Sequence, residues 1–262
     1  MKNLHKKILT AILIFDISTG LLLFSLYGNK LWDDRTEKNP AAGIVQSAGE
    51  REGSMAVNRE NGEPEKQVEE QRTVEQHEQR KVALTFDDGP HPYYTEQLLD
   101  GLKERSVVAT FFVTGEHAAL HPDVIKRMQE EGHLIGNHTY SHMQLNNSNR
   151  KKFKAELVAT NELLEEITGE EVIYVRPPYG TWDDTLEKEL NMIPVLWTID
   201  PLDWCSDDVA CVVTNVTEKV EENDIILLHD YYDSTVTATF KIVDELTEEG
   251  YVFVTVEEIL FD

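Results

Sequence analysis

Two adjacent acids, Asp87 and Asp88, follow an apolar run and precede a Gly-Pro pair. Two carboxylates side by side at the end of a strand repel one another unless a cation lies nearby. A divalent metal ion would supply that cation. The same letters also suit an ordinary Asp-Gly turn, in which neither acid does chemistry. The pair alone therefore leaves a turn and half of a metal site as alternatives.

His138 and His142 form the second candidate pair, because they stand four residues apart. Histidines at this spacing are neighbours on one face if the segment is helical. Together with one carboxylate they suit zinc or another divalent first-row metal, and they leave coordination positions for water and substrate. Two surface imidazoles would give the same spacing. Histidines without such a partner are expected in turns or at the surface: His91, His117, His121 and His133.

Three further motifs combine polar side chains with rigid or aromatic neighbours. Arg176 precedes two prolines, which stiffen the chain and can hold a guanidinium beside a carboxylate. From Asp200 to Trp204 an aromatic surface adjoins two acids, which suits a sugar ring, although an Asp-Pro turn with a core Trp is the plainer explanation. His229 ends an apolar run before Asp230, and burial beside a carboxylate would tune its pKa for acid catalysis.

These side chains need a scaffold that brings the ends of many segments together. Short β-branched runs alternate with longer segments of helical period, which is typical of parallel strands joined by helices. Strands are predicted at 81–86, 107–113, 134–137, 172–176, 195–199, 225–229 and 252–254. Helices are predicted at 95–104, 122–131, 149–168, 185–190, 207–222 and 236–249, with left-handed glycines expected after three of them at Gly132, Gly169 and Gly250.

Polar residues follow nearly every predicted strand, and this distribution decides between two α/β architectures. A β/α barrel builds its active site from many strand ends at one face, whereas an open doubly wound sheet gathers such residues at one switch point. We therefore expect an α/β fold, a short and distorted (β/α) barrel of about seven parallel strands.

The chain divides into three parts by composition. Residues 1–28 place lysines before a mostly apolar stretch, which indicates an uncleaved membrane anchor or a signal peptide; we favour the anchor, because no A-x-A cleavage site follows. Residues 29–79 are polar and predict a disordered linker. Residues 80–262 are long enough for a catalytic domain. That domain is therefore expected outside the cytoplasm.

Charge and cysteine content narrow the classes of partner. A formal net charge of −25 argues against nucleic acid, whose binding depends on clustered Lys and Arg. The two cysteines, Cys205 and Cys211, would be free to pair as a local disulfide outside the cytoplasm. Two small buried hydrophobes are an equal alternative.

Taken in order, the motifs T-F-D-D-G-P, H-x-x-x-H, R-P-P-Y, D-x-x-D-W and L-x-H resemble the polysaccharide deacetylases of the NodB-homology type, carbohydrate esterase family 4. The resemblance covers residues 79–262 and implies a distorted β/α barrel that removes N-acetyl groups from amino-sugar polymers. It also implies that Asp88, His138 and His142 hold the metal ion. Asp87 looks like the general base of this family, and Arg176 looks like the residue that tethers the base.

The same resemblance assigns the other half of the reaction. The backbone N–H of Tyr179 would stabilise the oxyanion, and Trp204 and Leu227 would line the pocket for the acetyl methyl group. His229 resembles the general acid, with Asp203 orienting it. Amide hydrolysis needs such an acid, because an amine leaves badly unless it is protonated.

The expected substrate is an N-acetylglucosamine polymer: peptidoglycan first, then chitooligosaccharide or an exopolysaccharide. A domain tethered by a linker of about fifty residues reaches the cell wall around a membrane. The expected cofactor is one divalent metal ion, zinc before cobalt, nickel or manganese. We expect a monomer attached to the membrane through its N-terminal segment. The alternatives are an O-acetyl polysaccharide esterase and a non-catalytic sugar-binding surface protein.

Overall fold

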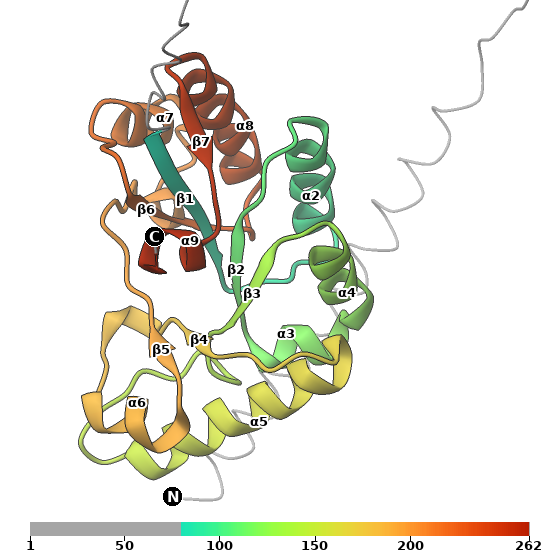
Figure 1. Ribbon diagram of the computed structural model, residues 1–262, viewed down its shortest axis with the longest axis vertical. Helices are drawn as coiled ribbons and strands as arrows, with labels where there is room; N and C mark the ends of the chain where they lie inside the picture. Colours follow the sequence, from blue (N-terminus) through green and yellow to red (C-terminus); the bar gives the residue numbers. More distant parts are fainter. Residues whose placement is uncertain (1–79, 262) are drawn as a thin grey trace, which may run out of the picture. The chain divides into compact units, whose positions relative to one another are not determined.

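The computed structural model describes residues 80–261, so the predictions for 1–28 and 29–79 lie outside the described residues. Seven strands form one parallel sheet in the order β5-β4-β3-β2-β1-β6, and β7 pairs with β1. Figure 1 shows the strands turning steadily from β1 toward β5. The strands are β1 (Arg80–Asp87), β2 (Thr110–Val113), β3 (Leu134–Asn137), β4 (Tyr174–Val175), β5 (Ile193–Pro194), β6 (Asp224–His229) and β7 (Tyr251–Phe253).

The predicted distorted barrel of about seven parallel strands is confirmed. The sheet is curled but does not close into a full ring within residues 80–261. Its end strands, β5 and β6, come together only where Ile199, which follows β5, makes an isolated bridge with Ile226 of β6. The fold is therefore a half-barrel.

Helices cover the outer face of the sheet, and neighbours pack in the order α7, α8, α2, α4, α5. No helix within the described part of the chain is long and apolar enough to cross a membrane. The helices are α2 (Tyr94–Glu104), α3 (Gly115–Leu120), α4 (Pro122–Glu130), α5 (Arg150–Thr168), α6 (Asp184–Leu190), α7 (Val209–Thr217), α8 (Asp233–Glu248) and α9 (Val256–Phe261), with short 3-10 helices η2 (Pro178–Gly180) and η3 (Asp203–Cys205).

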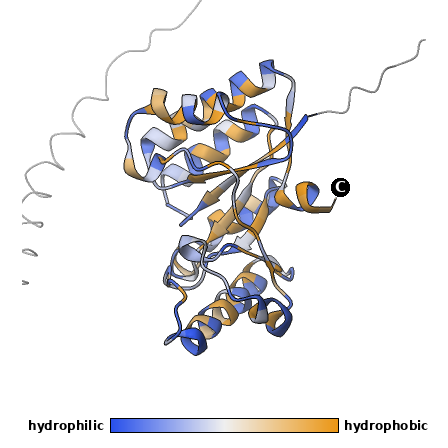
Figure 2. Ribbon diagram, turned by 90° about the vertical axis from the view of Figure 1, so that its left-hand side faces the viewer, coloured by the Kyte–Doolittle hydropathy of each residue, from blue (hydrophilic) through white to orange (hydrophobic). Residues whose placement is uncertain are grey.

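The alternation of side chains along β1 divides the core in two, because successive strand residues face opposite sides of a sheet. Val82, Leu84 and Phe86 lie in the larger core beneath the outer helices. Ala83 lies in a smaller core on the inner face. Asp87 shares this inner side by alternation, which directs it into the half-barrel. Figure 2 shows apolar residues along the central strands and mixed polarity along the helices.

The predicted strand at 195–199 is wrong, because the fifth strand is β5, and it ends at Pro194. The carbonyl oxygens that would continue the ladder have another partner. Val195 and Leu196 accept hydrogen bonds from the Arg176 guanidinium at 3.1 and 3.2 Å. This segment therefore holds a charged side chain instead of extending the sheet.

The helix predicted at 207–222 is shorter, since α7 starts at Val209 behind an Asp208 cap that accepts from the backbone N–H of Ala210 and Cys211. The helices α3 and α9 were not predicted. Each has six residues, which is too short to show a helical period in the sequence. The glycines expected after three helices do have positive φ, at 84°, 75° and 86°.

Candidate functional site

The parallel sheet brings the polar motifs to one edge. Asp87 and His229 end the neighbouring strands β1 and β6, where they are paired in register. His138 directly follows β3, and Arg176 directly follows β4. Because the carboxyl ends of parallel strands meet at one edge, side chains from distant parts of the sequence become neighbours there.

Asp88, His138 and His142 lie together. Asp88 Oδ1 is 3.4 Å from Nε2 of each histidine. One ligand atom from each of the three residues lies within 4.8 Å of the others, and no second group of this kind occurs within residues 80–261. The three side chains predicted to hold a metal ion are therefore adjacent.

His138 and His142 do not share a helical face, because the segment after β3 is a loop. Thr139 and His142 have left-handed backbone conformations, with φ of 62° and 53°. Glu156 of α5 anchors the loop by accepting hydrogen bonds from the backbone N–H and hydroxyl of Ser141, at 3.0 and 2.9 Å. The loop folds back, and the two imidazole centroids lie 4.9 Å apart.

The donor set fits a divalent cation. Nδ1 of His138 donates a hydrogen bond to the carbonyl oxygen of Arg176 at 2.7 Å. A carbonyl oxygen only accepts, so the proton lies on Nδ1 and the lone pair on Nε2 faces Asp88. Asp88 Oδ1 is buried and has no hydrogen-bond partner among the described residues. A lone pair facing an unsatisfied carboxylate is costly unless a cation lies between them.

The pKa shifts of Asp88 and His142 also favour the protonation states that metal binding requires. Burial raises the pKa of Asp88, but the neighbouring His138 and His142 imidazoles outweigh it and hold that pKa at about 2. Burial lowers the pKa of His142. An ionised Asp88 beside a neutral His142 is the state in which carboxylate and imidazole bind a metal ion.

Asp87 is buried against the fully buried Arg176. Nη1 of Arg176 donates to Asp87 Oδ1 at 2.9 Å and to the Thr85 hydroxyl at 2.6 Å. The guanidinium also stacks over the Phe112 ring, 4.2 Å from its centroid. Oδ2 of Asp87 is left on the side of His138, 3.7 Å from Nε2. The carboxylate is thus fixed with one oxygen toward the predicted metal ligands.

His229 is held by the buried Asp203. Nδ1 of His229 donates to Asp203 Oδ1 at 2.9 Å, and the backbone N–H of His229 donates to Oδ2 at 2.8 Å. The Thr235 hydroxyl donates to the same Oδ2 at 2.8 Å. Burial lowers the pKa of His229, but the hydrogen bond and charge of Asp203 outweigh it and raise the pKa to about 9.

A cavity of about 350 Å³ opens over these groups. Leu227 is buried in its wall, whereas Trp204 is 52% exposed. Tyr179 lines it from η2 with φ of 60°. Eight of the ten predicted site residues line this cavity: Asp87, Asp88, His138, His142, Tyr179, Trp204, Leu227 and His229. The other two, Arg176 and Asp203, contact Asp87 and His229 from buried positions.

Sequence reasoning missed a buried support beneath the Asp87–Asp88 turn. Asp230 is fully buried, and the Thr95 hydroxyl donates a hydrogen bond to it. Its carboxyl lies against Gly89, where a Cβ would come within 2.2 Å of Oδ2. Burial raises the pKa of Asp230 to about 7. The only sequence signal was an acid placed directly after His229.

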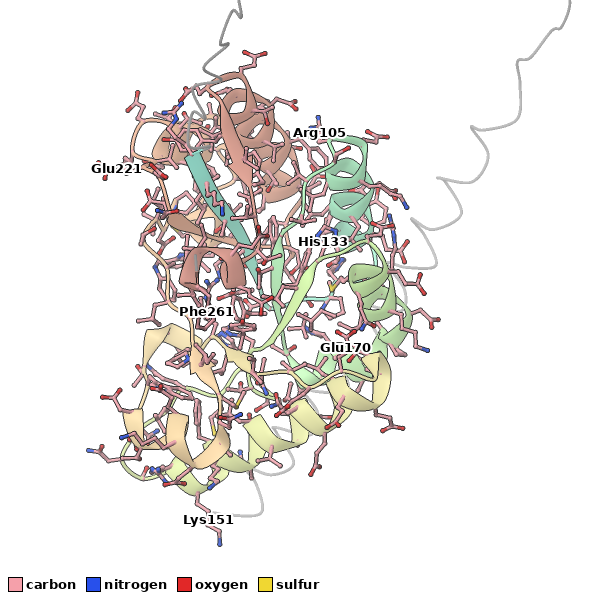
Figure 3. All side chains as sticks on the ribbon, in the orientation of Figure 1. Arg105, His133, Lys151, Glu170, Glu221 and Phe261 are labelled. Atoms are coloured by element: carbon pink, nitrogen blue, oxygen red, sulfur yellow. The ribbon has the colours of Figure 1, made fainter. Side chains whose placement is uncertain are left out.

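Two of the histidines assigned to turns or the surface have other positions. His133 is 6% exposed, so its assignment is wrong (Figure 3). Nδ1 of His117 lies 2.7 Å from the Asp88 carbonyl oxygen, which places this residue against the site. Cys205 and Cys211 are free and exposed, so the structure has neither the disulfide nor the buried hydrophobes considered for them.

The arrangement joins a metal-binding set, a tethered carboxylate and a protonated imidazole around one cavity. A carboxylate near a metal ion can take a proton from water, and a protonated imidazole can give one to a leaving group. These are the parts of a metal-assisted hydrolysis.

Comparison with known proteins agrees with this chemistry. Residues 74–195 match the family model described as polysaccharide deacetylase. The chain is 38% identical over 181 residues to the peptidoglycan-N-acetylmuramic acid deacetylase PdaC of Bacillus subtilis, covering 69% of this chain and 39% of that protein. It is 39% identical over 187 residues to a peptidoglycan-N-acetylglucosamine deacetylase of Bacillus cereus, covering 68% of this chain and 87% of that one.

The solved structure of peptidoglycan deacetylase PdaC from Bacillus subtilis superposes with a TM-score of 0.68 at 38% sequence identity. The match covers 70% of this chain and 91% of that structure. The chain spans less than half of the full length of PdaC.

Proposed function

Because the chain belongs to the polysaccharide deacetylase family, we propose that it is a metal-dependent hydrolase that removes N-linked acetyl groups from an N-acetylglucosamine polymer. One observation carries this proposal: a single cavity is lined by a set of side chains that can bind a metal ion, by Asp87, which pairs with the buried Arg176, and by His229, which pairs with the buried Asp203. Hydrolysis of an amide needs an activated water, a base for that water and an acid for the amine.

The contacts of each group give its role. Asp87 takes a proton from the attacking water at Oδ2, because Arg176 occupies Oδ1. The backbone N–H of Tyr179 donates to the developing oxyanion. His229 gives the proton on Nε2 to the leaving amine, because Asp203 holds Nδ1.

Asp88, His138 and His142 would hold the metal ion, for which zinc is our first proposal and cobalt, nickel or manganese the next. A bound divalent ion lowers the pKa of water from about 15.7 toward 7 and polarises a carbonyl. Leu227 and Trp204 contact the acetyl methyl group, since both line the cavity.

Peptidoglycan is the first polymer we propose, followed by chitooligosaccharide or an exopolysaccharide. The names of the Bacillus relatives support this order, since both are peptidoglycan deacetylases. We place the activity outside the cytoplasm, in a monomer whose catalytic domain spans 80–262. Residues 1–28 would tether it to the membrane or be removed as a signal peptide.

Acetate release from the full chain tests the proposal. The protein is treated with a chelator, reconstituted with single metals, and given purified peptidoglycan, chitotetraose or an O-acetylated xylan. We expect metal-dependent acetate release from the first two. Release from the xylan alone would assign the chain to O-acetyl esterases instead. Sugar binding without acetate release under any metal would make it a non-catalytic binding protein.

A further inference from the structure

A second cavity, of about 300 Å³, lies next to the one over the predicted metal ligands. The two cavities share Asp88, His142 and Tyr232 in their walls. Small-molecule sites usually measure roughly 300–1,000 Å³, so each cavity is small and suits about one sugar ring. The two cavities meet at the predicted metal ligands Asp88 and His142. They therefore suit two consecutive sugars of one chain, with the reacting sugar in the cavity that Asp87 and His229 line and the neighbouring sugar in the second cavity.

The second cavity offers the apolar surface that a sugar ring requires. Tyr231 and Tyr232 line it and are 37% and 38% exposed. The His117 ring lies 5.5 Å from that of Tyr231, measured between centroids. Aromatic faces that are half open to solvent combine an apolar body with a polar tip, which suits the mixed surface of a pyranose.

Charge gives this cavity a preference among sugars. Neither cavity has a Lys or Arg among its lining residues. Glu116, at the start of α3, lines the second cavity and is exposed. Among residues 80–261 no side chain makes a hydrogen bond or ion pair with its carboxylate. The occupant of this cavity therefore meets the Glu116 carboxylate directly, because no Lys or Arg of the cavity wall is paired with it.

We infer that Glu116 selects the charge of the sugar next to the one that reacts. This inference rests on the proposed function. The free amine left by an earlier deacetylation becomes a cation and is attracted to Glu116, whereas a free carboxylate, such as the lactyl group of N-acetylmuramic acid, is repelled. The favoured substrates are therefore chains whose neighbouring sugar is neutral or carries an amine, and one deacetylation promotes the next along the same chain.

Three oligosaccharides of equal length test this selection with the full, metal-loaded chain. They are fully acetylated chitotetraose, a partly deacetylated chitosan tetramer, and a peptide-free glycan tetramer with free lactyl carboxylates. The readout is kcat/KM for acetate release per acetyl group, expressed relative to chitotetraose. We expect the amine-bearing tetramer above this reference and the carboxylate-bearing one below it.

Glu116→Gln should bring both ratios toward one by about two- to fivefold, the range of an exposed ion pair. Raising the ionic strength should have the same effect in the wild type, because salt screens exposed charges. Glu170→Gln is the matched control. It removes the same charge from an exposed position that follows α5 (Figure 3) and lines neither cavity, so it should leave both ratios as they are.

Ratios that are the same in the wild type and in Glu116→Gln would overturn the inference. A uniform fall on all three substrates would do so as well, because it would show that Glu116 only supports the fold. These outcomes leave the proposed function standing. Failure to release acetate from any substrate with any metal would overturn both.

Discussion

Asp87 and His229 stand at the ends of neighbouring strands, yet their partners give them opposite tasks. Arg176 donates a hydrogen bond to one oxygen of Asp87, which holds the carboxylate in place and leaves its other oxygen free to accept a proton. Asp203 supplies a negative charge to His229, which favours an imidazolium that donates them. The two proton transfers that we propose would therefore be divided by the buried partner of each residue.

Substitution of either residue should separate catalysis from folding. Asp87→Asn and His229→Ala should keep the circular dichroism spectrum and the bound metal of the wild type. Acetate release should fall by about 100-fold or more, because general acid and base catalysis contribute roughly 10²–10⁴. The measurement is kcat together with the metal content of the purified variants. A near-normal kcat in either variant would remove that residue from the mechanism.

The pH profile reports on Asp203. The pKa of His229 is raised to about 9, and the acid must carry its proton, so kcat should fall as the pH rises through about 9. In Asp203→Asn the charge that raises this pKa is gone. The alkaline limb should move to lower pH by about 1–3 pH units. An unchanged limb would mean that another group donates the proton.

At the scale of elements, Arg176 ties together segments that share few backbone hydrogen bonds. It follows β4, which has only two residues, and it bonds to β1 and to the carbonyl oxygens of 195 and 196. A lysine has one donor group in place of the planar fork and cannot reach all of these acceptors. The inner wall of the half-barrel therefore depends on this side chain.

Arg176→Lys should lower the free energy of unfolding by about 2–4 kcal/mol, because buried carbonyl oxygens lose their donors. Urea denaturation measures the change. Arg150→Lys is the control, since Arg150 makes its ion pairs on exposed α5 and its loss should change stability little. If the two variants had equal free energies of unfolding, the hydrogen bonds of Arg176 would not contribute to the stability of the fold.

The helices and strands also show which parts of the fold could be predicted from the sequence. The strands before the first and second motifs were predicted, because their buried runs are long enough to be recognised. The strand predicted at 195–199 was wrong, because an apolar segment whose carbonyl oxygens bind a buried arginine has the same sequence pattern as a strand. Likewise, the loop after β3 brings His138 and His142 together through left-handed residues, a loop geometry that their spacing of four residues does not indicate.

The site residues could be predicted as one site only because the five motifs together resemble a known family. Asp230 and His117 support Asp88 from the sides, by contact with Gly89 and with the Asp88 carbonyl oxygen. These contacts join residues that are far apart in sequence. No local pattern predicts them, because they depend on how β6 and α3 pack around the turn.

For the molecule as a whole, His133 should weaken the fold in acid. It is buried, with its Nδ1 accepting from the backbone N–H of Ala109, and burial lowers its pKa to about 4. The unfolded chain binds this proton near pH 6.5, whereas the folded chain does so only near pH 4. Stability from His133 is thus present above pH 6.5 and is lost as the pH falls toward 4.

His133→Gln isolates this effect, because glutamine keeps an acceptor for Ala109 but does not titrate in this range. The difference in unfolding free energy between wild type and variant should shrink by about 3 kcal/mol from pH 6.5 to 4. Urea denaturation at each pH measures it. Because wild type and variant are compared at each pH, the contributions of other titratable groups cancel. One of these groups is Asp230, whose raised pKa makes the fold more stable as the pH falls. Parallel pH curves would contradict the prediction.

The pairing of β1 with late strands has a consequence for folding during synthesis. β1 comes first in the described chain, yet β6 lies along one side of it, and β7 shares the other side with β2. A ribosome releases β1 long before residues 224–253 exist. During that time most of the edges of β1 have no partner, and unpaired strand edges invite aggregation. We expect a nascent chain that is stalled before β6 to aggregate unless a chaperone binds it.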